Sequence, residues 1–217
     1  MFSGKNALEA VETSPSRFFI NFGCHMSLQE GIYMFVHNIE LMFKKLNLFS
    51  KTEMKLLVFI SEKEGELYER QIAEEAKVSV GSVNSIMKKF EKMGLVGKSR
   101  KGRMLFYRPD GKNPVLRQFK IFTTINGVAP VVEKIIPYSR RIILFGSCAE
   151  GRNTEQSDID LFVLSREKEK IRRIMEKHPR VRAILLDSVE YANLQQKDRP
   201  LYERIQKGIE LYGEEDG

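Results

Sequence analysis

Two apolar stretches decide the fold of this chain: Arg141-Ile-Ile-Leu-Phe-Gly-Ser147 and Asp158-Ile-Asp-Leu-Phe-Val-Leu164. Each contains a short continuous apolar run, which predicts a buried β-strand. The first strand ends directly in a Gly-Ser pair, and the second begins on two aspartates. Alternate residues of a strand share a face, so Asp158 and Asp160 are expected to project together while Ile159 and Leu161 face the core.

The paired aspartates predict a cation site beside a phosphate site. Two neighbouring carboxylates repel each other unless a cation lies between them, and hard oxygen ligands favour Mg²⁺ or Mn²⁺. Gly146 lets the backbone approach a ligand, and Ser147 adds a hydroxyl and an amide at an expected helix start, which suits phosphate. We therefore expect Asp158 and Asp160 to be catalytic and to bind the metal, while Gly146 and Ser147 bind a nucleoside triphosphate.

The spacing of these residues resembles the signature of a known family. Phe145-Gly146-Ser147, ten intervening residues and Asp158-x-Asp160 resemble the minimal nucleotidyltransferases of the DNA polymerase β superfamily. The resemblance covers about 138–217. It implies a small α/β core with a mixed sheet and Mg²⁺-dependent transfer of a nucleoside monophosphate from ATP or another triphosphate. Stand-alone members can act as antitoxins that adenylylate a small helical toxin, so such a toxin is one candidate partner and acceptor.

The chain departs from the family pattern at two places. Members usually have an Arg directly after Gly-Ser and often another two residues later, whereas this chain has Cys148 and Glu150. Members often carry a third carboxylate on the following strand, expected here over Val181–Leu186, and the matching position near Ile184 is apolar. Asp187 at the end of that strand is an alternative third carboxylate, and its more ordinary role is a helix N-cap.

The N-terminal half follows the order of a winged helix-turn-helix. Ser50 followed by Glu53 is typical of a capping box at a helix start. In a winged helix-turn-helix the third helix enters a DNA major groove and the hairpin contacts the DNA backbone. The expected elements are helices at 29–46, after Ser50, at Tyr68–Ala76 and after Ser79, and strands at Leu95–Arg100 and Arg103–Arg108.

Basic residues are concentrated in the same half. The net charge is +7; residues 1–137 hold 21 basic and 14 acidic residues, and 138–217 hold 15 of each. Lys88–Lys120 alone holds 11 basic and 2 acidic residues. Such a surface suits duplex DNA. The alternative is a small helical packing module whose basic residues only keep it soluble. The expected DNA-binding residues are Ser82, Ser85, Lys89, Lys92, Arg100, Lys101 and Arg103.

The composition indicates a folded protein with a sizeable core, since 42% of the 217 residues are hydrophobic and 30% are charged. No apolar stretch reaches the roughly 18 residues of a membrane span, so no membrane partner is expected. Cys24 and Cys148 are far apart in a chain whose N-terminus lacks an export signal, which favours reduced thiols and a cytoplasmic location.

These patterns predict an α+β protein with an N-terminal winged helix-turn-helix domain and a small C-terminal α/β nucleotidyltransferase-like domain with a mixed sheet. The connector is expected to contain helices at Val115–Ile125 and Pro130–Ile136, and a helix at Pro200–Tyr212 is expected to close the second domain. The predicted segments are an extension at 1–26, the winged helix at 27–112, a helical connector at 113–137 and the second domain at 138–217.

Three functions remain open at this stage. The leading hypothesis is a metal-dependent nucleotidyltransferase with an attached DNA-binding winged helix and an unknown acceptor. The competing hypothesis is a DNA-binding transcription regulator whose second domain is degenerate or only senses a nucleotide, which the missing Arg and third carboxylate favour. A third interpretation is a scaffold in which the winged helix mediates homodimerisation.

Overall fold

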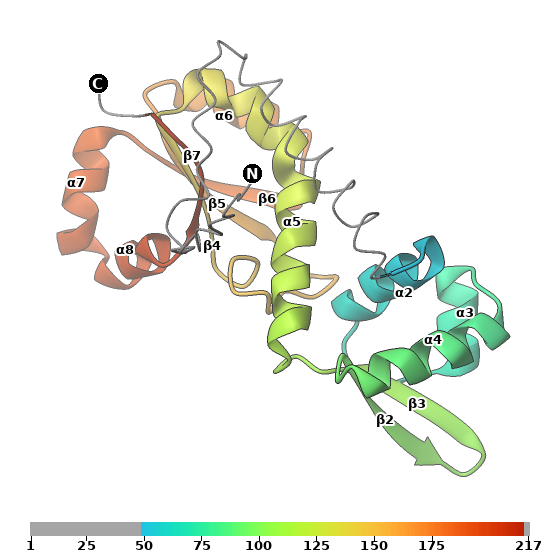
Figure 1. Ribbon diagram of the computed structural model, residues 1–217. Helices are drawn as coiled ribbons and strands as arrows, with labels where there is room; N and C mark the ends of the chain where they lie inside the picture. The colour runs from blue at the N-terminus through green and yellow to red at the C-terminus, as the bar shows by residue number, and fades with distance from the viewer. Residues whose placement is uncertain (1–48, 215–217) are drawn as a thin grey trace, which may run out of the picture.

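The computed structural model describes residues 49–214 (Figure 1). The predicted extension at 1–26 and the predicted helix at 29–46 lie outside the described residues. In chain order the elements are α2 (Lys51–Glu62), β1 (Leu67–Tyr68), α3 (Glu69–Ala76), α4 (Val80–Lys92), β2 (Val96–Lys101), β3 (Met104–Pro109), α5 (Pro114–Ile135), η1 (Ile136–Tyr138), β4 (Arg141–Phe145), β5 (Ile159–Leu164), α6 (Lys168–Met175), β6 (Val181–Leu186), α7 (Ser188–Lys197), α8 (Arg199–Gln206) and β7 (Ile209–Gly213).

Short-range capping begins the first helices as predicted. The Ser50 hydroxyl accepts a hydrogen bond from the Glu53 amide, and the Glu53 carboxylate accepts one of 2.6 Å from the Ser50 amide, so the capping box of α2 is complete. Ser79 caps α4 through the Ser82 amide. Buried residues of α2, α3 and α4 pack into one apolar core, which fixes the three helices against each other.

The hairpin that follows α4 is also present, one residue further along the chain than predicted. β2 and β3 pair antiparallel with Lys101 opposite Met104, and Gly102 between them takes a left-handed backbone with φ +62°. β1 adds a short third strand on β3, so the sheet order is β1-β3-β2. The described elements therefore have the helix, helix, helix and hairpin order that the sequence predicts.

The connector differs from its prediction, because one helix replaces two. α5 runs without a break from Pro114 to Ile135 and contains Pro130. Its first turns bury Leu116 in the core of the N-terminal helices, and its later turns bury Val131 against the sheet of the second half. Burial along the whole helix offsets the roughly 3 kcal/mol that an internal proline costs. α5 therefore belongs to both cores, and Figure 1 shows it running from the N-terminal helices to the sheet.

The second half is built on a mixed sheet, as expected, with strand order β6-β5-β4-β7. β4 pairs antiparallel with β5 and β7, and β5 pairs parallel with β6. Successive residues of β4 face opposite sides of the sheet: Leu144 packs with α5 and α6, whereas Ile143 packs with α7 and α8. Helices thus cover both faces of the sheet (Figure 1).

The end of the chain corrects another prediction. The helix expected over Pro200–Tyr212 is wrong beyond Gln206, because residues Ile209–Gly213 form the edge strand β7. Gly208 lies where a Cβ atom would be 2.5 Å from the Leu144 carbonyl oxygen. The chain therefore passes closely over β4 at a glycine before it turns into the sheet.

Candidate active site and nucleic-acid interface

The first residues of the site are brought together by the pairing of β4 with β5. Phe145 lies opposite Asp160 in this antiparallel ladder, so Gly146 follows the strand directly beside the Asp160 side chain. Gly146 has φ +73°, and a Cβ atom there would lie 2.8 Å from the Asp160 carboxylate oxygen Oδ2. Only glycine leaves room at this position. The backbone of the Gly-Ser pair thus comes within contact distance of a carboxylate of the Asp pair.

Asp160 is held in an environment that disfavours its charge. Burial raises the pKa of the Asp160 carboxyl, and the nearby Asp158 carboxylate acts in the same direction. The guanidinium groups of Arg204 and Arg182 oppose this rise without cancelling it. A cation between the two carboxylates would relieve the same repulsion, so the pair fits a divalent ion in donor chemistry.

The loop after Gly146 differs from its prediction. Residues 146–151 form turns, and no regular helix begins at Ser147. The Arg152 amide donates to the Ser147 carbonyl oxygen at 2.9 Å, and Gly151, with φ +64°, ends the turns in a left-handed conformation. A phosphate bound here would therefore meet individual amide groups rather than the dipole of a helix.

Cys148, in this loop, is a packing residue. It is buried, and its thiol donates to the Asp158 carbonyl oxygen with a sulfur–oxygen distance of 3.4 Å. Burial raises the pKa of the Cys148 thiol, which disfavours the reactive thiolate. Its side chain thus holds Asp158, the residue directly before β5.

A basic residue lies beside Asp160 on the adjacent strand. In the parallel ladder of β5 and β6, Asp160 pairs with Arg182. The apolar Ile184 pairs with Phe162, two residues further along each strand. The Arg182 guanidinium forms an ion pair of 2.8 Å with Asp158. Over residues 49–214, no group of three or more His, Cys, Asp or Glu side chains is arranged to hold a metal. The site therefore offers two carboxylates rather than three.

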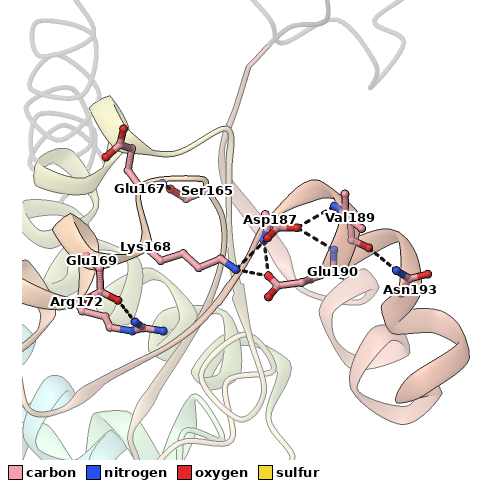
Figure 2. Close-up of polar contacts among 9 residues, drawn as sticks. All are labelled: Ser165, Glu167, Lys168, Glu169, Arg172, Asp187, Val189, Glu190 and Asn193. Atoms are coloured by element: carbon pink, nitrogen blue, oxygen red, sulfur yellow. Dashed lines mark hydrogen bonds and ion pairs between the residues drawn. The ribbon is translucent and has the colours of Figure 1, made fainter.

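Asp187 is a helix cap and lies away from the Asp pair. Its carboxylate accepts hydrogen bonds from the amides of Val189 and Glu190 at the start of α7, and it forms an ion pair of 3.2 Å with Lys168 (Figure 2). Asp187 follows the far end of β6, about five residues and roughly 16 Å along the strand direction from Arg182. It therefore cannot supply the third carboxylate, in agreement with its more ordinary role.

Sequence reasoning missed Arg204, which reaches the site from α8. The guanidinium carbon of Arg204 lies 5.4 Å from the centroid of the Phe145 ring. Its Nη2 atom lies 3.6 Å from the point that a Cβ atom on Gly146 would occupy. Nothing in the local sequence pattern distinguishes Arg204 from other basic helix residues.

On α4 the predicted DNA-binding residues differ in their exposure and in the polar contacts they already make. Ser85 and Lys92 are exposed, whereas Ser82 is half-buried and its hydroxyl lies 2.9 Å from the Ser79 hydroxyl in the helix cap. Lys89 forms an ion pair of 2.7 Å with Glu53. Sequence reasoning omitted Lys88, an exposed lysine that lies on this face. A surface hollow of about 410 Å³ is lined by Asn84, Ser85, Lys88, Lys89 and Lys92.

On the hairpin the three predicted cations are exposed. Arg100 and Arg103 line a second hollow of about 450 Å³, and the Arg100 Nε donates to the Gly102 carbonyl oxygen at the tip of the hairpin. Lys101 forms an ion pair of 2.6 Å with Glu66. The hairpin therefore presents a basic surface next to that of α4, with one of its cations already paired.

Residues 134–216 match the family model described as Polymerase beta, Nucleotidyltransferase. The matched segment contains the Gly-Ser pair, the Asp pair and the strands that position them. This confirms the family resemblance for the C-terminal part of the chain. No curated protein sequence matches the chain significantly.

Among solved structures, a protein from Sulfolobus solfataricus described as a nucleotidyltransferase is 21% identical, with 46% of this chain and 90% of that chain covered and a TM-score of 0.33. ZitR of Lactococcus lactis, solved as a mutant in complex with DNA, is 22% identical over 51% of this chain and 86% of its own, with a TM-score of 0.32. The adhesin competence repressor of Streptococcus pyogenes is 14% identical over 50% and 84%, with a TM-score of 0.31. Among residues 49–214, no helix has the length and apolar character needed to cross a membrane.

Proposed function

We propose that the protein transfers a nucleoside monophosphate from ATP or another nucleoside triphosphate to an acceptor. The observation that carries this proposal is the contact between the Gly146 backbone and the Asp160 carboxylate inside the segment that matches the nucleotidyltransferase family. Phosphoryl transfer needs a phosphate-binding backbone and a metal-binding carboxylate close together, because a metal held by the carboxylates would supply charge neutralisation at the bound phosphates.

Each residue of the site has a separate role in this proposal. Asp158 and Asp160 would hold Mg²⁺ or Mn²⁺, which would neutralise the triphosphate and the charge that develops during transfer. Gly146 leaves the space next to Asp160 open, and the amide and hydroxyl of Ser147 would orient the phosphates. A small helical toxin is one protein that could supply the acceptor group.

Transfer of label from α-labelled ATP tests the proposal. The acceptors to be tested are the protein itself, RNA ends and a small helical toxin. Asp160→Asn should reduce transfer by at least about 100-fold, because it removes one of two metal ligands. Asp187→Asn is the matched control, because Asp187 lies outside the site and Asn can still accept the capping hydrogen bonds. Equal loss in both variants, or undiminished transfer by Asp160→Asn, would contradict the assignment.

We also propose that α4 and the hairpin bind duplex DNA. The support is the exposed basic surface formed by Ser85, Lys88 and Lys92 on α4 and by Arg100 and Arg103 on the hairpin. Five phosphate contacts would give a slope of about −4 to −5 when the logarithm of affinity is plotted against that of salt concentration.

Neutralising the hairpin tests this interface. Replacing Arg100, Lys101 and Arg103 with Gln should flatten the salt slope by about 3. Replacing Arg172 and Arg173 on α6, far along the chain from the interface, is the control and should leave the slope unchanged. A wild-type slope near zero would contradict DNA binding.

One observation favours a second candidate function, a DNA-binding regulator that senses nucleotide without chemistry. Arg182 lies beside Asp160 on the neighbouring strand and neutralises Asp158, so the carboxylates already have a partner without metal. Nucleoside triphosphate and DNA binding without transfer to any acceptor would favour this candidate over the enzyme.

A further inference from the structure

The loop after Gly146 lacks the cation that a triphosphate site needs. The position directly after the Gly-Ser pair is Cys148, which is buried and donates a hydrogen bond to the Asp158 carbonyl oxygen. Arg152, further along the loop, forms an ion pair with Glu150. A triphosphate carries more negative charge than one divalent ion neutralises, and Arg182 is already paired with Asp158, so a further cation beside the loop would stabilise the bound phosphates.

Arg204 has the geometry to supply that cation. It lies on α8, next to Ile205, which is fully buried against the sheet and fixes this turn of the helix. The Arg204 guanidinium lies over the ring of Phe145, the last residue before the Gly-Ser pair, at 5.4 Å. Its Nη2 atom is 3.6 Å from the position that a Cβ atom on Gly146 would occupy. This position is empty only because the residue is glycine. The same charge acts on the Asp160 carboxylate.

The donors of Arg204 are left available by this arrangement. Within the described part of the chain, Arg204 contacts an aromatic ring rather than forming a direct ion pair with a carboxylate. By contrast, Arg182 is committed to Asp158 at 2.8 Å, and Arg199 at the start of α8 is committed to Glu203 at 2.8 Å. A guanidinium over an aromatic ring uses its charge in that contact rather than its N–H groups, so those donors can still bind phosphate oxygens in a bidentate manner.

We propose that Arg204 binds the triphosphate of the nucleotide, so that α8 provides the cation that the Gly-Ser loop lacks. This inference rests on the proposed nucleotide site at Gly146 and Asp160 and extends it to the phosphate contacts. Phe145 acts as a positioning residue, because its ring holds the guanidinium beside the loop. The ligand class is a polyphosphate, and the contact is independent of the nucleobase.

Calorimetric titration with inorganic tripolyphosphate and with ATP, each in Mg²⁺, tests the assignment. Arg204→Gln should weaken the binding of both ligands by about tenfold or more, as expected for the loss of a charge-assisted hydrogen bond. Arg204→Lys keeps a point charge without the planar fork, so it should recover part of the affinity. Arg199→Gln is the matched control on the same helix and should bind within about twofold of the wild type. The unfolding temperature of each variant verifies that it is folded.

The outcomes separate this inference from the proposed function. Unchanged tripolyphosphate affinity in a folded Arg204→Gln protein would overturn the assignment, even if nucleotidyl transfer is observed. A loss of affinity for ATP but not for tripolyphosphate would also overturn it, because Arg204 would then contact the nucleoside. If no acceptor is ever modified but Arg204→Gln still weakens tripolyphosphate binding, the transfer proposal fails and the phosphate site stands.

Discussion

At the scale of single residues, Asp160 determines how the site responds to pH. Burial raises the pKa of its carboxyl in the folded protein above the unfolded value, which is about 3.9. A carboxyl of this kind contributes stability below its unfolded pKa and loses that contribution as the pH rises through its folded pKa. At neutral pH without metal, the charged Asp160 therefore lowers the stability of the fold.

Asp160→Asn should for this reason raise the unfolding temperature at pH 7 in the absence of divalent ions, and the gain should disappear below about pH 4. Asp187→Asn should show the opposite trend, because the amides of Glu190 and Val189 and the Lys168 ammonium hold the pKa of Asp187 below its usual range. Its loss should therefore cost stability at pH 7 and little at low pH. Thermal unfolding between pH 3 and 8 measures both, and a parallel response of the two variants would contradict the opposite environments.

At the scale of elements, α4 depends on its N-cap for stability and on its exposed face for binding. The Ser79 hydroxyl accepts from the Ser82 amide, whereas Ser85 lies one turn later on the exposed face. Ser79→Ala should lower the free energy of unfolding by about 1 kcal/mol. Ser85→Ala should leave it unchanged or slightly raised, because alanine is the better helix former. Urea unfolding measures both changes, and an equal cost would show that Ser79 is not acting as a cap.

At the scale of the whole molecule, the loop between β4 and β5 connects the two cores. The Glu155 amide donates to the Glu62 carbonyl oxygen of α2 at 2.9 Å, and its carboxylate binds Lys63 at 2.7 Å. Gly151 of the same loop lies against α5, where a Cβ atom would be 2.3 Å from the Arg117 carbonyl oxygen. The loop that carries Ser147 at one end and leads to Asp158 at the other is thus packed against both α2 and α5.

Gly151→Ala should therefore lower the free energy of unfolding by about 3 kcal/mol, from a left-handed backbone and a clash with a rigid helix. Gly127→Ala, within α5, is the control, because among residues 49–214 no atom beyond its chain neighbours and the backbone of α5 lies within 4 Å of the new methyl group. It should raise stability by about 0.5–1 kcal/mol. Chemical denaturation compares the two variants, and similar values would show that the loop does not pack tightly against α5.

How much the sequence predicted depends on the range of the interactions involved. The capping box at Ser50, the hairpin after α4 and the buried strands of the second half were all predicted, because each depends on residues a few positions apart. The break at Gly146 and the alternation of Asp158 and Asp160 were predicted for the same reason. The unbroken α5 was not, because burial in two different cores overrides a proline and is absent from any local pattern.

The sequence by itself determined the class of the fold and the central residues of the candidate site: two carboxylates at the start of one strand and a glycine at the end of another. Only the tertiary structure decided which groups surround them. Strand register places Arg182 beside Asp160, packing of α8 brings Arg204 to the Gly146 loop, and the length of β6 separates Asp187 from both. Register and helix packing arise from contacts between residues distant in the chain, so the charge balance of the site could not be read from the sequence.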